Sequence, residues 1–110
     1  MIRESFGISI ANFVDEFRRA TDDQKIKMVK TPGMVFKKNI HNAYFAASVE
    51  YLCLGNHIPI PEWVHQKKYF LKNPFFAGGL ESLKAFLLVE SPLSFRRRNI
   101  FVSENVLVRV

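Results

Sequence analysis

The stretch NIHNAYFAASVEYLCL, residues 39–54, decides the fold, because it is the longest run of the chain that keeps helical spacing. Its apolar positions recur at the repeat of one helix face: Ile40, Ala43, Tyr44, Ala47, Tyr51 and Leu54. Several alanines keep one flank thin, so that another helix can approach closely. Gly55-Asn56 follows as a helix stop. We therefore predict that this segment is the central helix of the fold.

A first helix is predicted ahead of it, from about Ile8 to Ala20. One stripe of this segment is apolar and the other side carries charged residues, as in a helix that packs on a core. The stripe consists of Ile10, Phe13, Val14 and Phe17.

A short second helix is predicted after it, as far as about Lys30. It begins with Thr21-Asp22-Asp23-Gln24, the pattern of a capping box, in which the Thr hydroxyl and the Gln side chain each accept a backbone hydrogen bond. We expect Ile26 and Val29 to point inward. Pro32-Gly33 ends the helix, because the residue before a proline avoids helical geometry and glycine permits a turn.

The stretch from Ile58 to Gly79 is not predicted to form a long helix. Pro59 and Pro61 favour an extended backbone, and Pro61 suits the first position of a short helix. The segment Lys67–Gly79 is expected to be irregular but folded down onto the protein, because it carries several rings. These are Tyr69, Phe70, Phe75 and Phe76.

A further helix is predicted over Leu80 to Glu90, with its apolar residues buried. One more helical turn is predicted to follow, with Ser91 as its N-cap and Pro92 as its first residue. The β-branched tail is expected to form either a small hairpin around Ser103-Glu104-Asn105 or a short helix capped by Ser103. Together these elements predict a single all-α domain, residues 1–110, of about five helices with a short extended or helical C-terminal tail.

Composition and charge narrow the class of function. Hydrophobic residues make up 48% of the chain, aromatic residues 14%, and the formal net charge is +6. A basic, ring-rich domain of this kind favours acidic partners, whether a protein face, nucleic acid or a membrane surface. No run of the sequence is long and apolar enough to span a bilayer, and the start lacks the pattern of a signal peptide. With the lone Cys53, which fits a reducing compartment, these features predict a cytoplasmic protein.

Basic residues gather in three groups that could hold an anion. Arginine suits bidentate capture of carboxylate or phosphate, whereas lysines among aromatic rings can hold a single-stranded nucleic acid. The nucleic-acid candidates are Lys25, Lys27, Lys30, Lys37, Lys38, Lys67, Lys68 and Lys72, and the alternative is a solvated surface that keeps the protein soluble. The partner-binding candidates are Trp63, Tyr69, Phe70, Phe95, Arg96, Arg97 and Arg98.

The arginine run and the tryptophan each have a structural alternative. Successive residues of a helical turn point about 100° apart, so the three arginines cannot all face one ligand. We expect at least one to turn inward and to pair with a nearby acid, with Glu90 as the first candidate. Trp63 is the best single interface residue, because tryptophan is enriched in binding hot spots. Alternatively it anchors the proline segment to the core.

Templates for catalysis and metal binding are absent from the sequence. There is no phosphate-binding glycine loop, no nucleophile elbow and no pair of acids beside a histidine. Cys53, His57 and His65 match no zinc spacing. We expect a protein that is not an enzyme and that uses no metal and no cofactor.

From about Ala43 onward the chain resembles a group of short bacterial proteins of unknown function. The resemblance rests on the helix 44–54, on LGNHIPIPEW (54–63), and on FL…PFF within 70–76. Its most specific part is ESPLSFRRRNIFV, residues 90–102. Some relatives of this kind are C-terminal parts of helix-turn-helix regulators. Others are stand-alone partners of nucleotidyltransferase-like proteins in toxin–antitoxin type gene pairs.

One departure from the group weakens a DNA-reading role for this chain alone. Its N-terminal part is too short for a full helix-turn-helix domain, and Asp22 and Asp23 stand where a recognition helix would approach phosphates. The function expected is therefore that of a protein-binding regulatory subunit, antitoxin-like, which docks on an acidic surface. A nucleotidyltransferase-like toxin is the partner that the resemblance implies. The alternative is a nucleic-acid-binding module, and self-association is left open.

Overall fold

The computed structural model describes residues 6–33, 35–76 and 91–102, and this part of the chain is mostly helical. In chain order its elements are α1 (Phe6–Arg19), α2 (Asp22–Val29), α3 (Asn39–Gly55), the 3-10 turns η1 (Glu62–His65) and η2 (Lys67–Tyr69), β1 (Phe75–Phe76), α5 (Leu93–Arg96) and β2 (Ile100–Phe101). The helical class is confirmed. The number of helices is not, because these residues contain four α-helices. The helix predicted over 80–90 lies outside the described residues.

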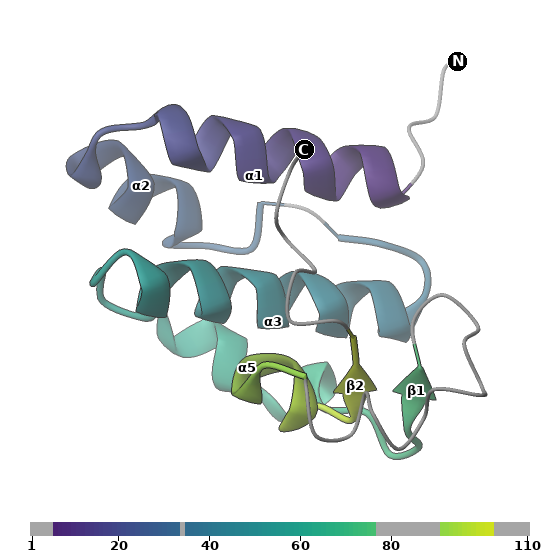
Figure 1. The fold of residues 1–110 in the computed structure, drawn as a ribbon. Helices are drawn as coiled ribbons and strands as arrows, with labels where there is room; N and C mark the ends of the chain where they lie inside the picture. Colours follow the sequence, from purple (N-terminus) through teal and green to yellow (C-terminus); the bar gives the residue numbers. More distant parts are fainter. Residues whose placement is uncertain (1–5, 34, 77–90, 103–110) are drawn as a thin grey trace.

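The middle of the molecule is α3, as the sequence predicts. Figure 1 shows α1 and α2 on one side of α3, and α5 with the two short strands on the other. A helix covered from both sides needs small or apolar side chains nearly all round, and α3 has them. Its buried residues are Ala43, Phe45, Ala46, Ala47, Ser48, Val49, Glu50, Leu52 and Cys53. Leu54, expected on the buried stripe, is instead exposed at the end of the helix.

The first two helices form as their local sequence predicts, with one correction. Ile10, Val14 and Phe17 of α1 are buried, and the capping box of α2 is complete: Gln24 N donates to Thr21 Oγ1 (3.3 Å) and Thr21 N to Gln24 Oε1 (3.0 Å). Val29 is buried as expected, but Ile26 is 40% exposed. Met28 and Val29 face the core, so Ile26 is rotated toward solvent.

Rings connect the three layers. Phe45 of α3 contacts Phe13 of α1 (ring centroids 5.1 Å apart) and stacks on Trp63 of η1 (5.9 Å). Trp63 in turn contacts Tyr69 (5.5 Å). The sequence places Phe45 off the expected stripe, yet it lies in the core because α3 is covered on two sides. Large rings fill this small core efficiently, which accounts for much of the phenylalanine content.

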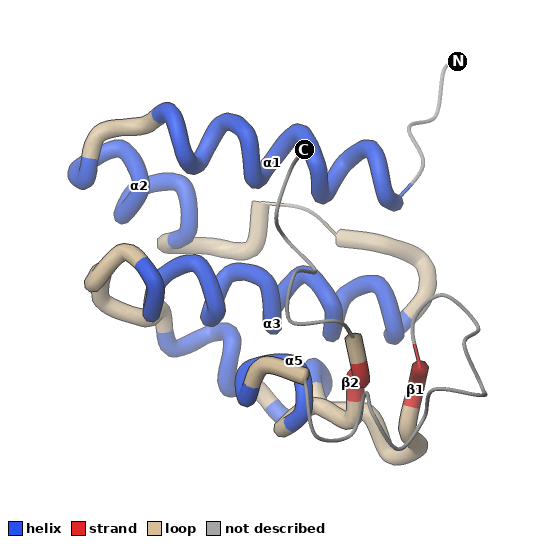
Figure 2. Tube along the Cα trace, viewed as in Figure 1, coloured by secondary structure: helices blue, strands red, loops and turns tan. Residues whose placement is uncertain are grey.

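The two strands pair in parallel, with Phe75 opposite Ile100 and Phe76 opposite Phe101 (Figure 2). Asn99 directly precedes β2 and has a φ of 64°, a left-handed conformation that asparagine tolerates. Its carbonyl accepts a hydrogen bond from Phe75 N (2.8 Å) and its side-chain amide donates to Leu71 O (2.7 Å). The segment 67–79, expected to be irregular, thus contributes η2 and β1. Both conformations proposed for the tail from Ser103 onward lie outside the described residues.

In the described parts of the chain, no helix is both long and apolar enough to cross a membrane.

Candidate functional site

The three consecutive arginines point in different directions, as their helical spacing predicts. Arg98 is completely buried, whereas Arg96 and Arg97 are exposed, the latter with 38% of its side chain accessible. The backbone continues helically at Arg97, where Arg97 N donates to Leu93 O (2.9 Å). Consecutive side chains on such a turn diverge by about 100°. Only one of the three can therefore enter the core.

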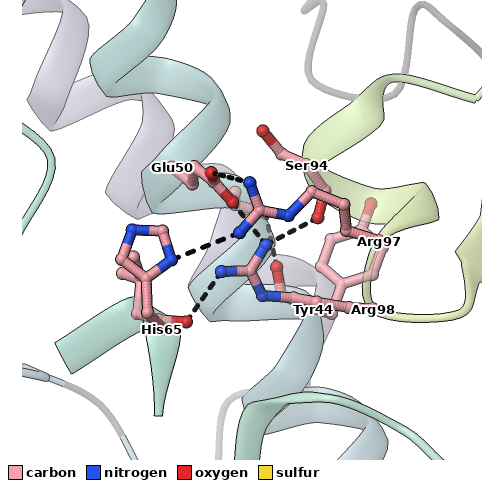
Figure 3. Close-up of polar contacts among 8 residues, drawn as sticks. Tyr44, Glu50, His65, Ser94, Arg97 and Arg98 are labelled. Carbon is pink, nitrogen blue, oxygen red and sulfur yellow. Dashed lines mark hydrogen bonds and ion pairs between the residues drawn. The ribbon is translucent and has the colours of Figure 1, made fainter. Parts of the chain in front are cut away.

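The buried Arg98 joins three segments, α3, α5 and η1 (Figure 3). Its Nη1 donates to Glu50 Oε1 of α3 and to Ser94 O of α5 (2.7 Å), and its Nη2 donates to Val64 O of η1 (2.7 Å). The guanidinium carbon also lies over the ring of Phe70, 4.7 Å from its centroid, at the distance of a cation–π contact.

Glu50 is held between two cations. While one carboxylate oxygen binds Arg98, the other lies 3.2 Å from Arg97 Nη1. Arg97 also reaches His65, with 3.3 Å between Arg97 Nη2 and His65 Nδ1. Burial lowers the pKa of Arg98, and the hydrogen bond and negative charge of Glu50 act in the opposite direction. The arrangement leaves one net positive charge, and Arg97 carries it toward solvent.

The buried Glu50–Arg98 pair acts as a structural brace. Glu50 and Arg98 are both closed to solvent, so neither can touch a substrate. A buried pair of this kind fixes a geometry more than it adds stability. Here it fixes α5 and η1 against α3, and so fixes the direction of the exposed arginines.

Glu50 is the residue that sequence reasoning missed. The expectation that one arginine turns inward to an acid is confirmed, but the acid is Glu50. The first candidate, Glu90, lies outside the described residues. A signal was present in the sequence: Glu50 is the only Asp, Glu, Lys or Arg within residues 39–54, and a charge on a helix buried on both sides needs a partner.

Ser91 has a different role from the one expected. The N-cap of α5 is Pro92, one residue later than predicted. The buried Ser91 hydroxyl accepts a hydrogen bond from Val102 N (2.8 Å) and donates one to Val102 O (2.9 Å). It therefore holds the end of β2 to the start of α5.

Most of the aromatic partner-binding candidates are core residues. Trp63, Tyr69 and Phe95 are buried, so their assignment to a docking surface is wrong, as is that of Arg98. The indole Nε1–H of Trp63 donates to Val29 O (2.7 Å), which ties η1 to the end of α2. The alternative stated for Trp63, that it anchors the proline segment to the core, is the correct one. Phe70 is half-buried beneath Arg98.

Exposed cations of two sequence segments come together on one side of α3. The segments are Trp63–Phe76 and Ser91–Val102, here called the basic layer, and backbone bonds such as Leu71 N to Arg98 O (3.2 Å) join them. Neither segment contains an aspartate or a glutamate, although the exposed Glu62, the first residue of η1, directly precedes the first segment. The exposed cations of the basic layer are Lys67, Lys68, Lys72, Arg96 and Arg97.

The remaining lysine candidates do not form one group. Lys27 and Lys30 are exposed on and after α2, where Asp22 and Asp23 offset their charge, and Lys25 lies 5.7 Å above the ring of Phe17. Lys37 and Lys38 precede α3. Figure 1 shows α2 and the start of α3 at opposite ends of the helical layers. The Pro32-Gly33 turn therefore separates the two sets of lysines.

Cys53 is a buried core residue. Burial, and secondly the charge of Glu50, raise the pKa of its thiol to about 11, so the reactive thiolate is scarce at neutral pH. Among the residues that the structure describes, no three His, Cys, Asp or Glu side chains gather as metal ligands.

No known protein family, no curated protein and no solved structure matches the chain.

Proposed function

We propose that this protein is a non-enzymatic regulatory subunit, antitoxin-like in its role, which docks its basic layer on an acidic surface of a partner protein. The observation that carries the proposal is the one-sided charge of this layer. Its two segments bring together Lys67, Lys72 and Arg96 without an acid among them. Glu50, the one acid of α3, already forms ion pairs with Arg97 and Arg98.

Such a surface favours an acidic partner in two ways. Its field speeds the diffusional encounter, and like charges on a wrong partner oppose binding. The buried brace adds order to this surface, because Arg98 ties α5 to α3 and η1. Arginines that are held in place before binding lose less conformational entropy when they meet a carboxylate.

The absence of catalysis is part of the same proposal. The Glu50–Arg98 pair is sealed from solvent, and the thiol of Cys53 is buried with a raised pKa. Both groups are better explained by folding than by chemistry on a substrate. A single buried cysteine suits a reducing compartment, and we assign the protein to the cytoplasm.

The partner class comes from the resemblance in residues 44–102. It favours a nucleotidyltransferase-like protein encoded next to this chain in a toxin–antitoxin type gene pair. Most of the string ESPLSFRRRNIFV, which carries the resemblance best, serves the fold: Ser91, Phe95 and Arg98 within it are buried. Among the described residues of the string, Leu93, Arg96 and Arg97 remain exposed to reach a partner.

Nucleic acid is the alternative partner, since the same cations would attract phosphates. The rings of the basic layer argue against a single strand that stacks its bases. Tyr69 is buried, and Arg98 lies over Phe70. Binding to a nucleic acid would therefore depend on backbone charge, with affinity falling steeply as salt rises.

Affinity capture with charge-reversed chains tests the proposal. The bait variants are Arg96→Glu with Lys72→Glu, and the matched control is Lys27→Glu with Lys30→Glu, which makes the same change of charge outside the basic layer. All four side chains are exposed, so the fold tolerates the changes. We expect a protein from the cells that produce this chain, above all the neighbouring gene product, to bind wild type and control but not the basic-layer variant.

Two results would overturn the proposal. One is that no captured protein distinguishes the basic-layer variant from the control. The other is that purified wild type binds labelled DNA or RNA in fluorescence anisotropy, with a log-linear salt dependence, while no protein is captured.

A further inference from the structure

An open groove lies where the ends of three helices meet. Its walls come from the end of α1, the end of α3 and the start of α5, and its volume is about 490 Å³. This is within the range of about 300–1,000 Å³ found for pockets that take small ligands. The lining residues are Arg18, Tyr51, Leu52, Leu54, Gly55, Asn56, Pro92, Leu93 and Ser94.

Two exposed leucines face this groove. Leu54 is 53% exposed and Leu93 is 58% exposed. The other large apolar side chains that the described residues expose, Ile8, Ile26 and Val35, do not line it. Single exposed apolar residues need no explanation, but an apolar patch in a hollow is typical of a binding site.

The two leucines are exposed for different reasons. Leu54 stands in the last turn of α3, directly after the buried Leu52 and Cys53, and its side chain lies on an exposed face of the helix. Leu93 is the first residue of α5 and points away from Phe95, which fills the core side of the same turn. Both positions are fixed by regular secondary structure, so the groove exists before a partner arrives.

Cations stand beside the groove. Arg97 follows Leu93 by one helical turn, which puts the two side chains on one face of α5. Arg96 is exposed on the same turn, and Arg18 itself lines the groove. No aspartate or glutamate is among the lining residues that the structure describes. Charge complementarity therefore favours an occupant that carries carboxylates around an apolar side chain.

A second hollow of similar size shows why this groove is the better site. It lies between α1, α2 and α3, with a volume of about 510 Å³. Its lining includes the carboxylate of Glu16 and the polar side chains of Ser9 and Asn12. It thus lacks both exposed leucines and the positive surroundings.

We propose that the groove between Leu54 and Leu93 receives an apolar anchor residue of an acidic protein segment, whose flanking carboxylates pair with Arg96 and Arg97. This inference rests on the proposed function and names the chemistry of the partner segment. The leucines supply the apolar contact, as pockets around hot-spot residues do. The arginines supply orientation and selection against basic segments.

A phage-displayed library of random peptides tests this inference. The library is panned on the immobilised full-length wild type and counter-selected on the double variant Leu54→Ser, Leu93→Ser. The best peptide is then synthesised, and its affinity is measured for wild type, Leu93→Ser, Arg96→Gln and Val35→Ser. Val35 is the matched control, because it is exposed and lies outside the groove.

We expect the selected peptides to combine Leu, Ile, Phe or Trp with Asp or Glu. Loss of one leucine contact should weaken binding by about tenfold, loss of Arg96 should weaken it mainly at low salt, and Val35→Ser should leave it unchanged. The inference is overturned if the selected peptides are basic, or if Leu93→Ser and Val35→Ser behave alike. It is also overturned if sedimentation shows a wild-type dimer that Leu93→Ser dissociates, since a second copy then covers the groove.

The proposed function and this inference can fail separately. If the captured partner is lost on reversal of Arg96 and Lys72 but kept by the leucine variants, the basic layer stands and the groove is not its docking site. If the charge reversal changes nothing, the proposed function itself falls.

Discussion

Arg98 and Glu50 are 48 residues apart in the chain, and they form an ion pair in which neither side chain is exposed to solvent. The pair connects the central helix to the basic layer. The Nη1 of Arg98 donates to Glu50 of α3 and to Ser94 O, and its Nη2 donates to Val64 O, so the guanidinium bonds the central helix and both segments of the basic layer. Nε of Arg98 is the one buried side-chain nitrogen of the described residues without a hydrogen-bond partner.

Removal of Glu50 should be strongly destabilising. In Glu50→Ala the guanidinium of Arg98 stays buried without its counter-charge, and breaking such a pair costs about 3–5 kcal/mol of unfolding free energy. The double variant Glu50→Leu, Arg98→Met removes both charges and should recover most of that loss. Urea unfolding followed by circular dichroism measures both. A cost of the single variant under about 1 kcal/mol would mean that water reaches the pair.

Substitution of Arg97 and of Arg98 should lower the unfolding free energy by very different amounts, although both side chains contact Glu50. Arg98→Gln loses bonds to three segments and should cost several kcal/mol, of the order found when a buried pair is broken. Arg97→Gln removes a partly exposed contact and should cost under about 1 kcal/mol. Urea midpoints of the two variants, measured side by side, test this order. Equal losses would contradict the assignment of Arg98 as the inward residue.

The capping box at the start of α2 should be measurable on its own. Thr21→Ala removes the hydroxyl that accepts from Gln24 N, and loss of an N-cap typically costs about 1 kcal/mol. Thr31→Ala is the control, because Thr31 is exposed and follows the helix. The midpoint temperature of thermal unfolding should be lower for Thr21→Ala than for wild type and for Thr31→Ala. Identical unfolding midpoints for the two variants would refute a contribution from the cap.

Stability should fall at alkaline pH, and Cys53 should account for the first part of the fall. Its pKa rises from 9.0 to about 11 on folding, so between these values the folded chain holds a proton that the unfolded chain has released. The unfolded state then binds fewer protons, and the unfolding free energy decreases as pH increases. Cys53→Ala should flatten this decrease, by up to about 1.4 kcal/mol per pH unit, in urea titrations across that range.

A second alkaline step should come from Tyr44. Burial raises its pKa from 10.0 to about 12, so the same sign applies at higher pH. Tyr44→Phe should leave the slope governed by Cys53 unchanged and reduce the slope above it. If neither variant alters the pH profile, these side chains are more hydrated than their burial indicates.

The only tryptophan offers a direct check on the core. Since Trp63 is buried and its indole is bonded to Val29 O, acrylamide should quench its fluorescence weakly in the folded protein and strongly in urea. Addition of a bound partner should change this quenching little, because the indole is not part of the docking surface. Strong quenching of the folded protein would show that Trp63 is exposed after all.

Local sequence was enough to predict α1, α2 and α3. Each depends on interactions within a few residues: the stripe from Ile10 to Phe17, the Thr21–Gln24 capping box and the stop at Gly55. Such patterns act through hydrogen bonds and side-chain neighbours one turn apart, so a window of sequence contains them. The inward turn of one arginine followed from the same geometry.

Only the tertiary structure decided which of the candidate recognition residues are buried in the core. Trp63, Phe95 and Arg98 looked like recognition residues in the sequence, and they are buried because contacts with Val29, Tyr44 and Glu50 enclose them. The parallel pairing of Phe75–Phe76 with Ile100–Phe101 is equally non-local. Burial depends on which distant segments fold together, and a one-dimensional pattern of polarity does not specify that pairing. What the sequence determined is a basic helical chain; the assembly of its layers decided which cations remain exposed.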